Sequence, residues 1–318
     1  MLRKILMIIV ATLAAAVAAV YLWPVPRSSF DAVYSRVDAV LTRSLRSFRT
    51  AHPVRQIRVG TTDWEYVSFG AGKETILFLH GMTGAHDIWW NQMEAMSSEY
   101  RVISVTYPAV KSLSELGSGV LAILDAEGVD RTNIAGSSLG GYLAQYLVAQ
   151  HPERVMRVVF SNTFPPNDLI AKNNRTIGLL LPYLPEWLVI SVLRGSFASS
   201  VYPASGNDEL TLAFLNEIGH GRMSKSQVIS RFRTIVERFE PADTTALGIP
   251  VMIVEADNDP LVEPELRRQL RQTYPAAELR TLSGVGHFPY LNRAGEYTTL
   301  LRDFFTTTEE LNSLKPQP

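Results

Sequence analysis

Apolar residues fall along this chain in three patterns, and each pattern predicts a different kind of structure. Residues 5–23 form an uncharged apolar run. Between residues 30 and 48, apolar side chains recur at helical spacing, with arginines on the other faces. From residue 57 onward, short apolar runs alternate with helical segments, which is typical of an α/β domain with a buried sheet.

The first run predicts a transmembrane helix, so we interpret residues 1–23 as an N-terminal signal anchor. A helix of this length, at about 1.5 Å per residue, crosses most of a hydrocarbon layer roughly 30 Å thick. Tyr21 and Trp23 stand where interfacial aromatic residues anchor a span. The alternative is a signal peptide cleaved near Ala18, which would release a secreted protein. Arg3 and Lys4 favour an N-terminus inside the cell, and hence a catalytic domain on the outer side, whereas Arg27, Arg36 and Arg43 oppose that orientation.

The second pattern, within residues 24–50, predicts one juxtamembrane amphipathic helix from Phe30 to about Phe48. Ser28 or Ser29 can cap its N-terminus. Two interpretations stay open. The helix lies on anionic lipid, or it is a stalk that packs on the following domain.

The third pattern predicts one domain over residues 51–318. An opening hairpin is expected at 57–59 and 64–69, followed by strands at 75–79, 102–106, 132–135, 155–161, 251–256 and 278–282. Helices are expected at 116–127, 263–273 and 296–305, besides the one that follows residue 138. The fold class is therefore α/β, with a mostly parallel, doubly wound sheet.

One stretch interrupts the alternation of strands and helices. From about residue 164 to 247 we find no convincing strand, only apolar helical pieces separated by Pro, Gly and Ser. An insertion at this point is expected to form a helical cap over the carboxyl ends of the strands. Ligands bind at that edge in open α/β sheets.

The strongest chemical motif lies at Gly136 to Gly140, between a predicted strand and a predicted helix. It has the form G-x-S-x-G, in which the serine sits on a turn so tight that only small neighbours fit. Such a turn exposes the hydroxyl of Ser138, our candidate nucleophile. It also places the Leu139 N–H at a helix N-terminus, where it can face a developing oxyanion.

A serine nucleophile needs a base that is itself held by a carboxylate, and both follow later in the chain. His287 lies in a glycine-rich loop after the last predicted strand, and Asp259 lies just after the strand at 251–256. The order Ser138, Asp259, His287 is that of the hydrolase elbow fold. Asp257 remains the rival for the acid.

The loop after the strand at 75–79 is expected to supply the second oxyanion donor. Gly81 permits a tight backbone there, so the N–H of Met82 can pair with that of Leu139. We interpret the neighbouring His80 as a buried structural residue.

Composition narrows the function further. The chain has no cysteine, which excludes thiol catalysis and thiolate metal sites, and its histidines show no zinc-type spacing. With 30 Lys and Arg against 31 Asp and Glu, charge gives no argument for nucleic acid as a partner. We expect no metal or organic cofactor. The expected partners are a small acyl or lipid-like substrate and, through residues 1–23, a membrane.

These motifs resemble the α/β-hydrolase fold superfamily over about residues 57–305. Within it, the segments at 101–110, 136–155, 160–164 and 287–293 are similar to maspardin-like hydrolases. The stretch 106–112 departs from the D-x-R-G-x-G-x-S pattern of many cap-bearing members, which fits that branch. The resemblance implies a serine hydrolase that cleaves a carboxylic ester or related acyl compound. It also implies two alternatives: a non-catalytic binding or adaptor protein, and an acyltransferase or C–C hydrolase with the same triad.

Overall fold

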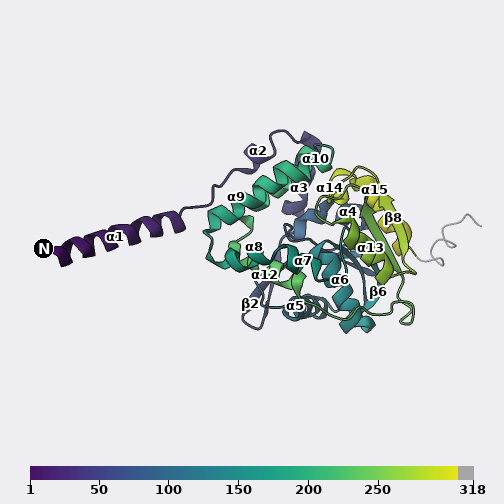
Figure 1. Cartoon of the computed structure of the whole chain (residues 1–318). Coiled ribbons are helices and arrows are strands. Elements are labelled where there is room, and N and C mark those ends of the chain that lie inside the picture. Colours follow the sequence, from purple (N-terminus) through teal and green to yellow (C-terminus); the bar gives the residue numbers. More distant parts are fainter. Residues whose placement is uncertain (307–318) are drawn as a thin grey trace, which may run out of the picture.

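The computed structural model describes residues 1–306, so the end of the predicted 51–318 domain lies outside the described residues. Its centre is an eight-stranded sheet in the order β1-β2-β4-β3-β5-β6-β7-β8 (Figure 1). The β1–β2 and β2–β4 pairs are antiparallel, and all the other pairs are parallel. The strands are β1 (Arg55–Val59), β2 (Thr62–Phe69), β3 (Thr75–Leu79), β4 (Arg101–Thr106), β5 (Thr132–Ser137), β6 (Val155–Ser161), β7 (Val251–Ala256) and β8 (Glu278–Leu282). All eight predicted strands are confirmed.

The central strands β3, β5 and β7 are buried on both faces, as a mostly parallel sheet requires. Alternate residues of β3 divide between two cores: Ile76 and Phe78 pack into one, whereas Leu77 and Leu79 pack into the other. The helices of the α/β framework are η1 (His86–Trp89), α4 (Trp90–Met96), α5 (Leu113–Ala126), α6 (Leu139–Gln150), η2 (Pro152–Arg154), α13 (Pro264–Thr273), α14 (Pro289–Asn292) and α15 (Ala294–Phe305). The predicted helices in this part are confirmed to within a few residues.

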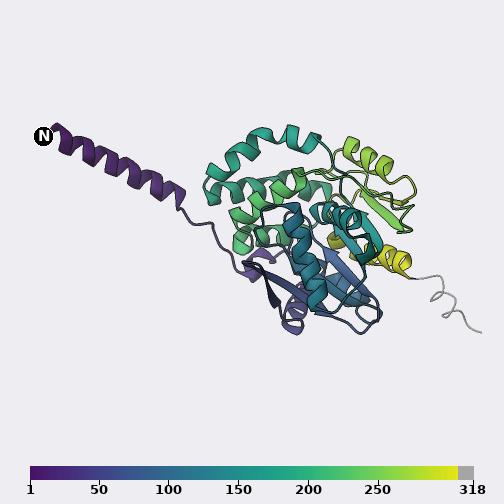
Figure 2. The same cartoon turned by 90° about the horizontal axis from the view of Figure 1, so that it is seen from below.

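The insertion between β6 and β7, all of it within the described residues, contains helices and loops but no strand, as expected, and we call residues 162–250 the cap. Figure 2 shows its helices gathered on one side of the sheet. They are α7 (Leu169–Asn173), α8 (Arg175–Leu180), η3 (Leu181–Tyr183), α9 (Glu186–Ser196), η4 (Phe197–Val201), α10 (Tyr202–Ala204), α11 (Glu209–Glu217), η5 (Ile218–Arg222) and α12 (Lys225–Val236).

Before the domain, α1 (Leu2–Tyr21) projects away from the body in both views (Figures 1 and 2). It is 20 residues long with a mean hydropathy of 2.2, and none of it is buried, so its length and composition suit a membrane span or a signal sequence. Within residues 1–306 it is the one helix with these properties.

The predicted single helix from Phe30 to Phe48 is wrong. The structure instead has α2 (Phe30–Val33) and α3 (Ala39–Ala51), because the side chain of Asp38 caps the N-terminus of a new helix by accepting from the Val40 N–H. Leu45 and Phe48 of α3 are fully buried in the core of the domain. Of the two interpretations left open, packing on the domain therefore describes α3.

Candidate active site

Ser138 sits between β5 and α6, at the sharp turn that the sequence predicts. Its backbone has a φ of 56° and a ψ of −121°, a conformation that non-glycine residues seldom adopt and that recurs at functional sites. The glycines on both sides are required sterically. A Cβ at Gly136 would lie 2.3 Å from the Gly140 oxygen, and one at Gly140 would lie 2.0 Å from the Leu79 oxygen.

His287 and Asp259 lie together, both buried. His287 Nδ1 lies 2.8 Å from Asp259 Oδ2 and 3.0 Å from Oδ1. Asp259 also accepts from Asn162 Nδ2 at 2.8 Å and from the Leu261 and Val262 N–H groups at 2.8 and 3.1 Å. Burial alone would raise the pKa of Asp259, but His287 and these hydrogen bonds outweigh it and hold that pKa below its usual range. The acid therefore stays ionised beside the ring.

The rival acid, Asp257, lies elsewhere. It is exposed, and its carboxylate accepts from the Ser283 hydroxyl and the Gly284 N–H across the turn after β8. These bonds, the one from Ser283 first, keep the pKa of Asp257 low. Its geometry is that of a turn-stabilising residue, while the carboxylate that contacts His287 belongs to Asp259.

The predicted oxyanion loop packs directly against the elbow. A Cβ at Gly81 would lie 3.0 Å from Ser138 Cβ, so the loop approaches Ser138 as closely as glycine allows. Within residues 1–306, neither the Met82 N–H nor the Leu139 N–H donates a hydrogen bond to another protein group. Two unpaired backbone donors beside the Ser138 hydroxyl are what a developing oxyanion at that position would need.

Arg231 of α12 holds this loop, and sequence reasoning missed it. The buried guanidinium donates to the carbonyl oxygens of Met82 at 2.5 Å, Gly84 at 3.2 Å and Tyr107 at 2.9 Å. Burial lowers the pKa of Arg231 to about 10, so it remains cationic at neutral pH. The signal in the sequence was an arginine at a position that the helical period of α12 assigns to the buried face.

Asn162 was missed as well. It follows the last residue of β6 with a φ of 42° and donates to both Asp259 and the Gly286 carbonyl oxygen. A polar residue directly after a buried parallel strand lies at the same sheet edge as the acid after β7, and that placement was the available signal.

The other histidines near the site have structural roles. His80 is fully buried, with Nδ1 2.6 Å from the Gly81 carbonyl oxygen, as a structural residue should be. Burial and the nearby Arg231 hold the pKa of His80 well below its ordinary value. His220 of the cap binds the Pro26 carbonyl oxygen at 2.8 Å and does not line the cavity described next.

A cavity of about 400 Å³ lies between the sheet edge and the cap, and Ser138 and His287 both line it. Gly81 and Met82 contribute to its wall from the oxyanion loop. Most of the remaining wall is apolar and comes from α7, α8, η3, α9, η4 and α12 of the cap. Within residues 1–306 no hydrogen bond joins Ser138 Oγ to His287, so that contact stays a prediction, as is common before substrate binds.

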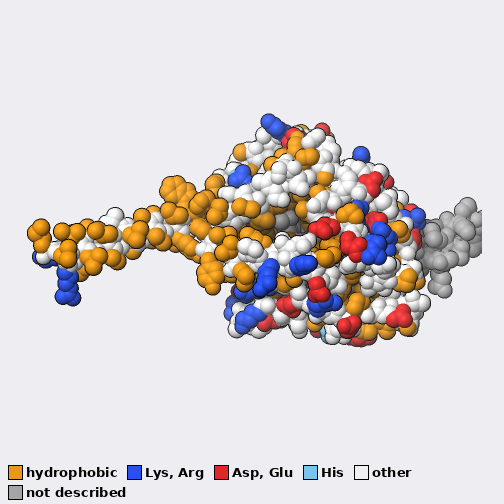
Figure 3. All heavy atoms as spheres, viewed as in Figure 1, with side chains coloured by type: hydrophobic (Ala, Val, Ile, Leu, Met, Phe, Trp, Pro, Cys, Tyr) orange, Lys and Arg blue, Asp and Glu red, His pale blue; other side chains and the backbone are white. Residues whose placement is uncertain are grey.

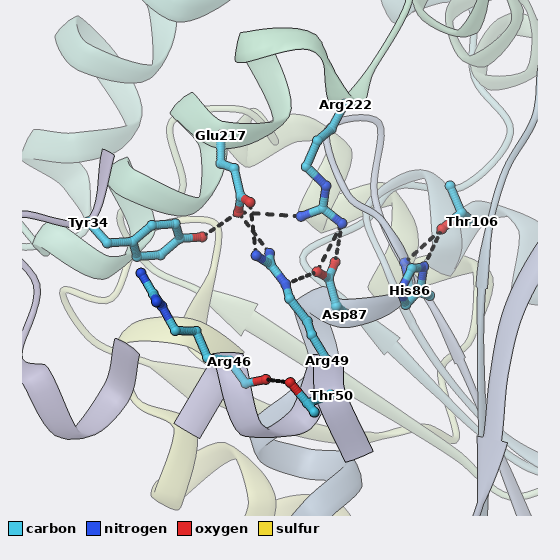
Figure 4. A network of polar contacts seen from close by, with 9 residues as sticks. All are labelled: Tyr34, Arg46, Arg49, Thr50, His86, Asp87, Thr106, Glu217 and Arg222. Atoms are coloured by element: carbon cyan, nitrogen blue, oxygen red, sulfur yellow. Dashed lines mark hydrogen bonds and ion pairs between the residues drawn. The ribbon is translucent and has the colours of Figure 1, made fainter. Parts of the chain in front are cut away.

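A separate polar network fixes the N-terminal segment to this site (Figure 4). Asp87 of η1, which is fully buried, accepts from Arg49 of α3 at 2.8 Å and from Arg222 of η5 at 2.9 Å. Arg49 also donates twice to Glu217 of α11, at 2.9 and 2.8 Å, and Glu217 accepts from the Tyr34 hydroxyl at 2.7 Å. Burial would raise the pKa of Asp87, but the two guanidiniums hold it well below its usual range. The network thus joins α3, the cap and the segment after the oxyanion loop.

The sheet order, the nucleophile elbow and the helical cap define an α/β hydrolase. The family model described as "alpha/beta hydrolase fold" matches residues 74–294, and the chain belongs to that family.

Its relatives include maspardin from Danio rerio, which is 26% identical over 259 residues covering 78% of this chain and 81% of that protein. The 2-hydroxy-6-oxononadienedioate/2-hydroxy-6-oxononatrienedioate hydrolase of Paraburkholderia phymatum is 26% identical over 258 residues, 75% of this chain and 89% of its own. The crystal structure of the enol-lactonase from Burkholderia xenovorans matches 80% of this chain and all of its own, with a TM-score of 0.67 and 19% identity. The resemblance to maspardin-like hydrolases is therefore confirmed.

Proposed function

We propose that this protein is a serine hydrolase that cleaves a carboxylic ester or a related acyl compound through an acyl-enzyme. The observation that carries the proposal is one cavity lined by both Ser138 and His287, with Asp259 bound to the far side of the His287 ring. Hydrolases among the relatives of the chain support the reaction type.

In the first half-reaction, Ser138 Oγ attacks the acyl carbon while His287 Nε2 takes the hydroxyl proton. The carbonyl oxygen becomes an oxyanion and accepts from the Met82 and Leu139 N–H groups. The tetrahedral intermediate collapses as His287 returns the proton to the leaving alcohol. Ser138 is left as an ester of the acyl group.

In the second half-reaction, His287 deprotonates a water molecule that attacks the same carbon, and the acid leaves as Ser138 regains its proton. Asp259 accepts from the Nδ1–H, so Nε2 is the nitrogen left free to take a proton. The carboxylate also stabilises the imidazolium formed during each transfer. None of these steps requires a metal or an organic cofactor.

The direct test is labelling of the purified protein with a fluorophosphonate, compared with Ser138→Ala. We expect one adduct per chain, located at Ser138, and none in the variant. A folded wild-type protein that gives no adduct would refute the enzyme assignment. A panel of p-nitrophenyl esters of rising chain length, with the same variant as control, then gives the acyl preference.

Two other functions are compatible with specific observations. Similarity to maspardin leaves a non-catalytic binding or adaptor protein as the second candidate, and an unlabelled Ser138 would favour it. An acyltransferase or C–C hydrolase would use the same triad with another acceptor or leaving group. Such an enzyme would label at Ser138 but hydrolyse simple esters poorly.

We also propose that α1 is an uncleaved single-pass anchor and that the catalytic domain lies on the outer side of the membrane. The length and apolarity of α1 support an anchor, and Arg3 and Lys4 before its apolar part support this orientation. Mass spectrometry of the mature N-terminus distinguishes the anchor from a secreted protein cleaved near Ala18. Protease access to the domain in intact cells tests the side.

A further inference from the structure

The outer face of the cap is apolar and uncovered. Large apolar side chains of α8, η3 and α9 are between 42% and 76% exposed there: Ile177, Leu179, Leu180, Tyr183 and Val192. Figure 3 shows apolar side chains gathered at the end of the body from which α1 departs. We call these five residues the cap face. A contiguous exposed patch of this kind marks an interaction site.

The end of α1 is fastened beside the cap face. Trp187 Nε1, in the first turn of α9, donates to the Val20 carbonyl oxygen at 2.7 Å. Lys225 Nζ, at the start of α12, lies 3.4 Å from the Tyr21 hydroxyl and 5.3 Å from the centre of that ring. In Figure 1, α8 and α9 accordingly lie on the side of the domain that faces α1. A lipid layer that contains α1 would therefore reach the cap face.

Charge around the cap face also suits a lipid surface. Residues 169–200 carry three cations, Lys172, Arg175 and Arg194, against one acid, Glu186. Apolar side chains flanked by cations are the pattern of segments that lie at the boundary of anionic lipid.

The catalytic cavity opens at the same face. Ile177 of α8 and Val192 of α9 both line the cavity and are 42% and 58% exposed, so the wall of the cavity is continuous with the outer surface between these helices. Ser138 lines the same cavity. An acyl chain that entered between α8 and α9 would meet apolar side chains along its path.

We propose that the cap face inserts into the lipid layer that holds α1, and that the cavity takes a long-chain acyl ester directly from that layer. The substrate half of this proposal rests on the proposed hydrolase function. The docking half does not, because it requires only the cap face and α1. The occupant of the face is thus the bilayer itself.

The docking half is tested with the full chain reconstituted in vesicles of phosphatidylcholine and phosphatidylglycerol. Because the chain has no cysteine, Tyr183→Cys places a single environment-sensitive fluorophore on the cap face. We expect its emission to be quenched by doxyl groups on lipid chains. Leu279→Cys, on β8 and 44% exposed, is the matched control and stays unquenched. Leu179→Cys repeats the measurement if the first variant does not fold.

Equal quenching at the cap face and at the control, or none at the cap face, would overturn the docking proposal. The docking proposal is also overturned if the label becomes shielded only as the protein concentration rises, since that pattern indicates that a second copy of the chain covers the cap face. Neither outcome depends on catalysis.

The substrate half is tested with Leu179→Gln combined with Leu180→Gln, two residues that do not line the cavity. We expect hydrolysis of a long-chain ester in vesicles to fall about tenfold or more, because less apolar surface holds the cap in lipid. Hydrolysis of a soluble short-chain ester and fluorophosphonate labelling are expected to stay unchanged. Leu247→Gln with Leu279→Gln is the control. An equal loss on both esters refutes the lipid route, whereas failed labelling of wild-type protein refutes the hydrolase function.

Discussion

Replacing Arg231 by Met removes the cation that holds the oxyanion loop. The change leaves the carbonyl oxygens of Met82 and Gly84 without a donor in a buried region, whereas that of Tyr107 keeps its hydrogen bond from Gln227 Nε2 at 2.9 Å. An unsatisfied buried acceptor costs about 1–3 kcal/mol, so two of them predict a loss of roughly 2–5 kcal/mol in the free energy of unfolding after local relaxation. Released from Arg231, the loop no longer fixes the Met82 N–H. Loss of one oxyanion donor lowers kcat by about 10²–10³-fold.

The assay combines urea unfolding with ester kinetics, in which kcat is divided by the fraction of sites that a fluorophosphonate titrates. This normalisation separates a misplaced oxyanion donor from a merely unfolded fraction. Arg233→Met is the matched control, since Arg233 lies on the same helix but is exposed. If the normalised kcat of Arg231→Met equals that of Arg233→Met, then Arg231 does not position the oxyanion loop, whatever happens to stability.

Two further substitutions test the acid and the polar network. Asp259→Asn is expected to lower kcat by about 10⁴-fold, because the amide reverses the His287 tautomer. Asp257→Asn is expected to change kcat only a few-fold. Comparable losses of kcat in the two variants would show that Asp259 is not the triad acid. Asp87→Asn leaves two partly buried guanidiniums facing an amide, so the free energy of unfolding measured with urea at pH 7 is expected to fall by about 3 kcal/mol. Because the folded pKa of Asp87 is depressed, its contribution is present above the unfolded pKa of about 3.9 and is lost as pH falls further. The difference in the free energy of unfolding between wild type and Asp87→Asn should therefore narrow below about pH 4. A difference that stays constant with pH would contradict the ion-pair explanation.

The parts of the fold that were predictable from sequence are those in which the local pattern and the tertiary structure agree. The run at 75–79 is apolar from Ile76 to Leu79 because β3 is buried on both faces, and the structure begins and ends the strand at the predicted residues. The elbow was predictable for a similar reason. Gly136 is demanded by a contact with Gly140, only four positions later.

Besides the local cap at Asp38, the failures involve contacts between residues distant in sequence. The helical period from residue 30 to 48 is real, yet the chain leaves the helix after Val33, and the Tyr34 hydroxyl bonds to Glu217, 183 positions away. Arg231 has acceptors up to 149 positions away, and nothing in its own helix points to them. Periodicity reports which face of a helix is buried but not what that face contacts.

The ion pairs of Arg49 also decide where a shortened, water-soluble form of this protein should begin. The sequence places the start of the domain at residue 51, and a truncation there would remove Arg49 together with the core residues Leu45 and Phe48. Glu217 and Asp87 would each lose a charge partner, and a hole would open beside α4. Cutting near residue 29 instead removes α1 and keeps the whole network. We therefore expect the minimal folded unit to start about twenty residues earlier than the predicted domain.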